Sequence, residues 1–277
     1  MEKEDYRKLY EYYEIFNKDK SFLDVFYDIN APVPYKNLLI YPVKTLYYKV
    51  FHSFALCFFV NKYDSGIPEC MGFNPLQFLF YQDPARGIDN ATNYLPLLEQ
   101  LLLMCLKKEI MTGKEKTIRF IKKEKNKCFF YIEDEIYDWQ DFEAIRDIIC
   151  KQNCIELPDY KIHPDIRKKL KEKEELLNRV NNNKIASFEE LIDCLMLAGH
   201  YDEDYILNLS IRRFTNLLQR YNIMKNYELM TILSPNFDKA DRDKIPSWIS
   251  AIPKSDQYFS KVQNIADIQS QIGNINK

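Results

Sequence analysis

Glycine is scarce in this chain, with only 6 among 277 residues, whereas it usually makes up roughly 7% of a protein. It supplies the positive-φ turns and the close backbone approaches that phosphate and cofactor loops need. One stretch, Thr112-Gly113-Lys114, resembles a phosphate loop but lacks that motif's first Gly and its following Ser or Thr. We therefore expect no nucleotide-binding loop and no cofactor.

Histidine is scarcer still, with three residues, His52, His163 and His200. Cys150, Cys154 and His163 could offer three metal ligands, but a structural zinc site uses four. The chain has no G-x-S-x-G motif and no Cys in a recognisable catalytic context. The sequence thus predicts neither an enzyme nor a metal site, and we interpret its seven cysteines as reduced core thiols.

Long apolar runs are missing as well. No segment reaches the ~18 apolar residues of a membrane-spanning helix. The first residues, Met1–Arg7, lead into mixed polar and aromatic residues rather than the apolar run of a secretory signal. The formal net charge is only −2, which argues against a dedicated nucleic-acid binder because such proteins carry an excess of Lys and Arg. We expect a soluble cytoplasmic protein with no membrane partner.

Apolar residues are plentiful, at 46% of the chain, and this length suits one large domain with an appended piece, or two domains. The patterns predict an α+β, helix-dominated fold with a small antiparallel sheet or hairpin in the first half and an all-α C-terminal part. We expect an amphipathic helical arm over residues 1–30, an α+β domain over 31–157, a charged bridging helix over 158–185, and a helical domain with a mobile tail over 186–277.

Several helices are expected before residue 155. Residues 31–37 contain two prolines and predict an extended connector, and Leu38–Val43 reads as a short strand. Thr45–Val60 is dense in Phe and Tyr, which predicts a largely buried helix. Asn74-Pro75 is typical of a helix start. Ala91–Ile110 is apolar almost all round, as expected of a helix at the centre of a domain.

A charged hairpin is expected next. Lys116–Lys122 and Lys127–Glu133 alternate in part, Glu135–Tyr137 suits a third short strand, and Asp138 suits the cap of a following helix. Basic side chains cluster on this hairpin and form a candidate nucleic-acid contact, although Lys also protects exposed strand edges: Arg119, Lys122, Lys123, Lys125 and Lys127.

The second half reads as helical. Ser187 and Glu190 form an S-x-x-E capping box, and Gly199 suits a helix C-terminus. Asp204–Leu233 predicts one long amphipathic helix that packs inside the C-terminal part through an apolar stripe with 4,3,4,3 spacing: Leu207, Ile211, Phe214, Leu218 and Tyr221.

Aromatic side chains near the two ends are candidates for protein binding. Tyr6, Tyr10 and Tyr13 lie on one face of the predicted N-terminal helix, and Trp248 lies in the polar C-terminal tail. Exposed aromatic side chains of this kind can bind a helix of another protein. Ordinary core packing is the alternative for each of them.

Four segments carry a resemblance to proteins of long-tailed bacteriophages that infect Gram-positive bacteria. They are LLIYPVKTLYYKVFHSFALCFFV (38–60), IYDWQDFEAIRDIICKQNCIELPD (136–159), SFEELIDCLMLAGHYDEDYILNLSIRRFTNLLQRYNIMKNYEL (187–229) and IPSWISAIPKSDQYF (245–259). In the first, a short YPV strand leads into a Tyr/Phe-rich helix, as in those proteins. The chain resembles products of the phage morphogenesis region.

The resemblance implies a tail assembly chaperone, which binds the long tape-measure protein and keeps it soluble until tail tube subunits polymerise around it. It implies another phage protein as the partner, the host cytoplasm as the location, and no catalytic residues. A structural virion component of the tail or baseplate is the first alternative. A regulator that contacts nucleic acid through the basic hairpin is the second.

Overall fold

The computed structural model describes residues 21–64, 67–81, 94–107, 117–122, 127–157, 166, 169, 172–173, 186–236 and 247–249. The chain forms two compact units, Met1–Pro158 with Tyr201–Thr215, and Asp159–His200 with Asn216–Lys277. The fold is α+β and helix-dominated, with two small antiparallel sheets, as predicted. None of the described helices is long and apolar enough to cross a membrane.

The described part of the first unit begins with α2 (Ser21–Asp28) and a hairpin of β1 (Val33–Tyr35) and β2 (Leu38–Ile40). The predicted connector over residues 31–37 therefore contains a paired strand. Pro34 is tolerated there because the two-stranded sheet leaves β1 at an edge.

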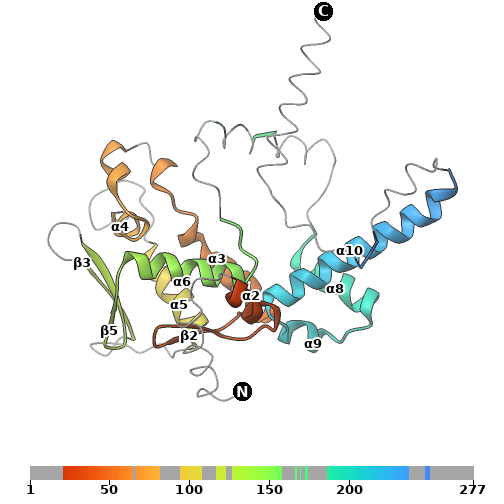
Figure 1. Cartoon of the computed structure of the whole chain (residues 1–277), viewed down its shortest axis with the longest axis horizontal. Coiled ribbons are helices and arrows are strands. Elements are labelled where there is room, and N and C mark those ends of the chain that lie inside the picture. Colours follow the sequence, from red (N-terminus) through yellow and green to blue (C-terminus); the bar gives the residue numbers. More distant parts are fainter. Residues whose placement is uncertain are drawn as a thin grey trace, which may run out of the picture. The chain divides into compact units, whose positions relative to one another are not determined.

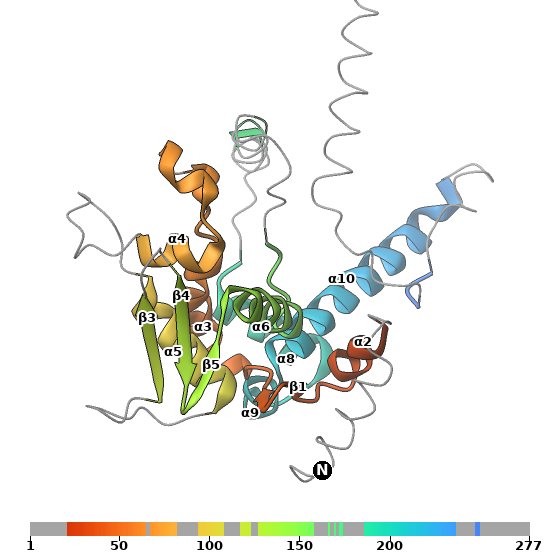
Figure 2. The same ribbon diagram turned by 60° about the vertical axis from the view of Figure 1, so that its left-hand side comes forward.

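A second antiparallel sheet has the order β3-β4-β5, and its strands are β3 (Ile118–Lys122), β4 (Cys128–Ile132) and β5 (Glu135–Tyr137). It confirms the predicted hairpin and third strand. Alternate residues of β4 are buried, as the period of two in a strand requires. Figures 1 and 2 show helices lying beside this sheet, with α4 (Pro75–Tyr81) against β4 and α5 (Leu95–Leu106) against β3.

Two of the predicted helix starts are confirmed at atomic detail. Asn74 Oδ1 accepts from the Gln77 amide at 2.8 Å, and Gln77 Oε1 accepts from the Asn74 amide at 2.9 Å, which caps α4. Asp138 and Asp141 form the same reciprocal box at the start of α6 (Trp139–Gln152). Such boxes satisfy amide groups that have no acceptor within the helix.

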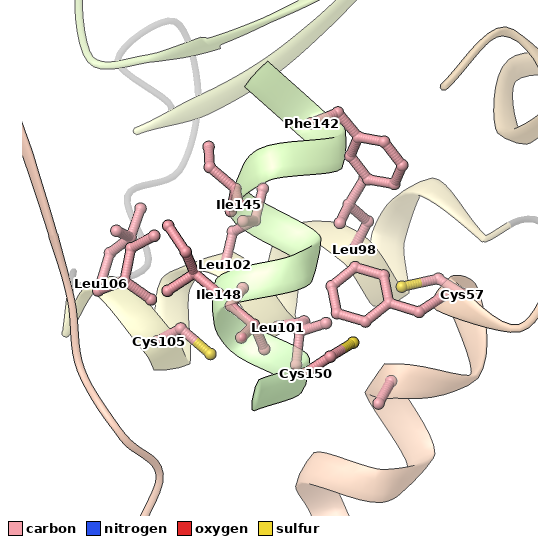
Figure 3. Packing of buried hydrophobic residues seen from close by; sticks show 14 of the residues in the cluster. Cys57, Leu98, Leu101, Leu102, Cys105, Leu106, Phe142, Ile145, Ile148 and Cys150 are labelled. Carbon is pink, nitrogen blue, oxygen red and sulfur yellow. The ribbon is translucent and has the colours of Figure 1, made fainter. Parts of the chain in front are cut away.

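The core of this unit lies where α5 and α6 face each other (Figure 3). Leucines of α5 meet Phe142, Ile145 and Ile148 of α6, and three cysteine side chains lie among them. All of these residues are buried: Leu98, Leu101, Leu102, Leu106, Phe142, Ile145, Ile148, Cys57, Cys105 and Cys150.

The predicted helix over Thr45–Val60 differs from the structure in two ways. It consists of a 3-10 turn η1 (Thr45–Tyr47), α3 (Tyr48–Ala55) and a second 3-10 turn η2 (Leu56–Phe58). The expectation that it is largely buried is wrong, because five of its large apolar residues are exposed to solvent: Leu46, Tyr47, Val50, Leu56 and Phe59. Aromatic density in a sequence does not distinguish a core face from a surface face.

The predicted helix over Asp204–Leu233 is interrupted. It forms α9 (Glu203–Asn208) and α10 (Ile211–Leu233), separated by an extended Leu209. The carbonyl of Leu209 accepts from the Thr45 amide at 2.8 Å, and the Ile211 amide donates to the Val43 carbonyl at 2.8 Å. This pairing with a distant segment supplies hydrogen bonds that a continuous helix would otherwise make, so tertiary structure overrides helical periodicity.

The same interruption corrects the predicted packing of the apolar stripe. Ile211 and Phe214 are buried in the first unit, where Ile211 joins the main core and Phe214 contacts Tyr48 edge-to-face at 6.2 Å. They do not pack inside a separate C-terminal part, as the sequence had predicted. Leu218 and Tyr221 are half-buried.

The second unit contains α8 (Phe188–Gly199), the rest of α10, and a 3-10 turn η8 (Ser234–Asn236). Ser187 and Glu190 form the predicted capping box of α8. The residue that ends this helix in the left-handed region is His200, with φ of 52°, rather than Gly199. Within this unit the Arg220 guanidinium donates to the carbonyl of Trp248 at 2.8 Å.

Candidate functional site

The first unit contains an open pocket of about 970 Å³. Its walls come from three stretches of chain that are far apart in the sequence. These are the segment from Asn30 to Phe54, the last two turns of α5 up to Lys107, and the α9–α10 junction at Asn208 and Ser210. Ligand pockets in proteins commonly have a volume of about 300–1,000 Å³, so the size suits a bound group.

Backbone hydrogen bonds fix the wall formed by residues 41–45. The Tyr41 amide donates to the Cys105 carbonyl at 2.7 Å, at the end of α5. The Val43 amide donates to Asn153 Oδ1 at 2.9 Å, at the end of α6. Lys44 and Ser210 form an isolated antiparallel bridge. This wall is therefore held from three sides by elements that belong to the core.

The pocket contains two cationic side chains. The Lys44 ammonium donates to Asn208 Oδ1 at 2.8 Å. Lys107 ends α5 with φ of 50°, and its ammonium lies 4.2 Å from the centre of the Tyr41 ring. Among the described residues that line the pocket, none is Asp, Glu, His or Cys. The lining therefore offers positive charge, amides and hydroxyl groups without an acid–base pair.

An apolar helix surface adjoins the pocket. Val50 follows Leu46 by four residues and Tyr47 by three, and Phe54 follows Val50 by four, so neighbouring turns of η1 and α3 bring these side chains together; we call the surface of Leu46, Tyr47, Val50 and Phe54 the α3 face. Its first three members are 54%, 47% and 46% exposed. Tyr47 and Phe54 also line the pocket. The α3 face and the pocket thus form one continuous candidate surface.

A second exposed apolar group lies in the second unit. The last turns of α10 expose four large side chains, Leu229, Met230, Ile232 and Leu233. A soluble protein rarely exposes such groups together unless they contact something.

The candidate protein-binding residues chosen from the sequence are only partly described. Tyr6, Tyr10 and Tyr13 lie outside the described residues, as does most of the predicted bridging helix over residues 158–185. Trp248 is exposed, and its backbone is tied to α10 by Arg220. Its role in binding stays a prediction.

The basic hairpin is described in part. Arg119 and Lys122 are exposed on β3, an edge strand, and Lys127 precedes β4, whereas Lys123 and Lys125 lie outside the described residues. The Arg119 guanidinium donates to the Glu133 carbonyl at 3.2 Å and lies 5.3 Å from the centre of the Tyr131 ring. These contacts fit a side chain that covers a sheet edge, and a nucleic-acid contact stays a prediction.

The cysteines are free thiols. Burial raises the pKa of Cys150 to about 12 and also raises the pKa of Cys154. His163, the third residue of the possible metal set, lies outside the described residues. Within the described ranges no three His, Cys, Asp or Glu side chains are grouped so that they could hold a metal ion. The prediction of core thiols is wrong for Cys194, which is exposed.

Sequence reasoning did not identify the pocket. Its residues show no shared motif, and they come together through pairings between distant segments, such as the Lys44–Ser210 bridge and the hydrogen bond from the Tyr41 amide to the Cys105 carbonyl. The one available signal was the strand predicted over Leu38–Val43, which includes Tyr41 and leads directly into Lys44 and Tyr47, although in the structure only Leu38–Ile40 forms a strand. That signal pointed to the segment but not to its chemistry.

Residues 179–253 match the family model described as the YomV second domain. That family is phage-derived, from phages resembling Bacillus phage SPBeta, so the match supports a phage protein. It covers about a quarter of the chain, including α8, α9 and α10. Neither a curated protein nor a solved structure matches the chain.

Proposed function

We propose that this chain is a non-enzymatic phage protein that acts through protein–protein contacts during tail assembly, as a chaperone of the tape-measure protein. The observation that carries the proposal is the α3 face, where large apolar side chains are exposed beside an open pocket. Contiguous exposed apolar surface marks interaction sites on soluble proteins. A phage-derived domain within the chain supplies the context.

The exposed end of α10 supports the same proposal. Leu229, Met230, Ile232 and Leu233 lie within the segment that matches the phage family. A long client can be held by several such surfaces, each of which contacts a short segment of it. The described pocket lining, with amides and lysines but no acid–base pair, suits binding more than catalysis.

Co-expression with the tape-measure protein of the same phage tests the proposal. The client should stay in the soluble fraction only when this protein is present, and the two should copurify. Val50→Asp places a charge on the α3 face and should abolish the effect. Ile136→Asp is the matched control, since Ile136 is a similarly exposed aliphatic residue on β5. A client that is equally soluble with the Val50→Asp variant contradicts a role for this face.

The protein content of mature phage particles distinguishes an assembly factor from a structural component. An assembly chaperone leaves before the tail is complete, so mass spectrometry of purified virions should not find it. Its presence at a fixed copy number per particle would instead show a structural component of the tail or baseplate.

A further inference from the structure

Among the residues that the structure describes, the two lysines of the pocket are not paired with a carboxylate. Within the described part of the chain, no Asp or Glu lies within ion-pair distance of the Lys44 or Lys107 ammonium group. Among the described residues, the Lys44 ammonium bonds the neutral amide of Asn208, and the Lys107 ammonium lies over the Tyr41 ring. Both side chains are exposed. The pocket therefore carries two positive charges that an anionic partner can approach.

The rest of the pocket is apolar or neutral. Leu103, Met104 and Phe54 contribute apolar wall, while Asn30 and Gln100 contribute amide groups. A volume of about 970 Å³ is far larger than a simple anion requires. Moreover, the apolar surface continues from the pocket onto the α3 face. A fitting partner must therefore combine negative charge with apolar groups over a length greater than the pocket.

We infer that the pocket binds an acidic peptide segment of the partner protein, in which Asp or Glu residues alternate with aromatic or aliphatic ones. This inference rests on the proposed function, because it assigns the chemistry of the segment that the α3 face receives. The partner's carboxylates pair with Lys44 and Lys107, and its apolar side chains contact Tyr47 and Phe54. Side-chain amides such as those of Asn30 and Gln100 satisfy the polar groups of an extended peptide backbone.

A designed peptide array tests the inference without knowledge of the natural partner. Its peptides permute Asp and Glu with Leu, Phe, Trp and Tyr, and each has a counterpart with Asn and Gln in place of the acids. Fluorescence anisotropy with the full chain then measures the affinity of the best labelled peptides. Acidic peptides should bind better than their amide counterparts, and the affinity should fall as salt rises because the charges are exposed.

Reversing the charge of the two pocket lysines tests whether the peptides bind in the pocket. The double variant Lys44→Glu/Lys107→Glu should weaken the best peptides by about tenfold or more, since like charges then face each other. Lys151→Glu makes the same kind of change at an exposed residue outside the pocket and should leave the affinity unchanged. A second double variant, Lys44→Gln/Lys107→Gln, with a thermal melt of each protein, separates loss of charge from loss of folding.

Several results would overturn the inference. They are the absence of any binding acidic peptide, equal binding of amide counterparts, and full affinity in both double variants. Displacement of a bound peptide by ATP, without dependence on the α3 face, would assign the pocket to a nucleotide instead. If these tests fail while Val50→Asp still abolishes the co-expression effect, the proposed function stands and only the acidic chemistry is wrong. If the acidic peptides bind at the pocket but the tape-measure protein does not bind, the pocket chemistry stands and the tape-measure protein is not the partner.

Discussion

The hydroxyl of Tyr35 donates to Asp141 Oδ1 at 2.6 Å, and this contact joins the first hairpin to α6 across 106 positions of sequence. The Lys36 ammonium lies 2.6 Å from the same oxygen, and Asp141 Oδ2 accepts from the Asp138 amide at 3.0 Å. One carboxylate therefore both caps a helix and anchors a hairpin. The sequence predicted Asp138 as the cap of this helix, but it indicated neither the part of Asp141 in the capping box nor its anchoring of the hairpin.

The anchor predicts a loss of stability in acid. Burial acts to raise the pKa of Asp141, but hydrogen bonds from Lys36, Tyr35 and Asp138 outweigh it, and the pKa lies below its usual value. The contact therefore stabilises the fold above the unfolded-state pKa of about 3.9, and this contribution is lost as pH falls through the lower folded-state value. Asp141→Asn should lower the urea midpoint at neutral pH.

Urea unfolding of both proteins at a series of pH values provides the measurement. The difference between wild type and Asp141→Asn should shrink below about pH 4, where this carboxylate begins to be protonated in the unfolded state while the folded protein still holds it ionised. Asp147→Asn is a matched control, because Asp147 lies on the same helix with 62% of its side chain exposed. A constant difference across the whole range would contradict the assignment.

Helix and strand boundaries were predictable where the chain carries its own local signals. The helix starts at Asn74, Asp138 and Ser187 were predictable because each cap satisfies amides within three residues, although a reciprocal box was predicted only for Ser187. The hairpin of β3 and β4 was visible for a similar reason, because alternation is a local pattern. These features depend on nothing far away in the chain.

Long-range pairing was not predictable. The stripe from Leu207 to Tyr221 has helical spacing throughout, yet Leu209 is extended because it pairs with Thr45. Periodicity says which residues share a face but not which core receives that face, so Ile211 and Phe214 were assigned to the wrong part. The pocket escaped notice for the same reason, since its two lysines belong to segments that only tertiary structure brings together.

A cavity in the core should lower the free energy of unfolding. Leu101 is fully buried between α5 and α6 (Figure 3), so Leu101→Ala removes packed apolar atoms that the surroundings cannot replace. We expect a loss of about 2–5 kcal/mol in the free energy of unfolding. Leu56→Ala, at an exposed leucine of the same unit, should change it by less than about 0.5 kcal/mol. Chemical denaturation of both variants measures these values, and similar losses would show that α5 is not at the centre of the core.

Thiol labelling should separate the cysteines by burial. Burial raises the pKa of Cys57 and Cys105 far above the usual range and excludes reagents from both side chains. Cys194 is exposed on α8. Because the thiolate is the reactive form, an aromatic disulfide reagent at mildly alkaline pH should modify Cys194 within the native protein, and Cys57 and Cys105 only on unfolding. Peptide mapping after a short pulse identifies the labelled sites, and early labelling of Cys105 would contradict its placement.

The wall of the pocket depends on the buried side chain of Asn153. Asn153 is 1% exposed, and its Oδ1 accepts from the Val43 amide at 2.9 Å, one residue before Lys44. Asn153→Ala leaves the buried backbone N–H of Val43 without an acceptor, which should lower the free energy of unfolding by about 1–3 kcal/mol. It should also weaken peptide binding, because the segment that carries Lys44 loses one of its three supports.

The matched control is Asn208→Ala. Asn208 is exposed and bonds the Lys44 ammonium from the pocket side. Its loss should cost less than about 0.5 kcal/mol of stability, while it frees Lys44 to pair with a ligand. The two variants therefore separate support of the wall from direct contact in the pocket: thermal melts should single out Asn153→Ala, and anisotropy should show weaker peptide binding for that variant alone. Equal melting temperatures would show that the Val43 wall does not need its support from α6.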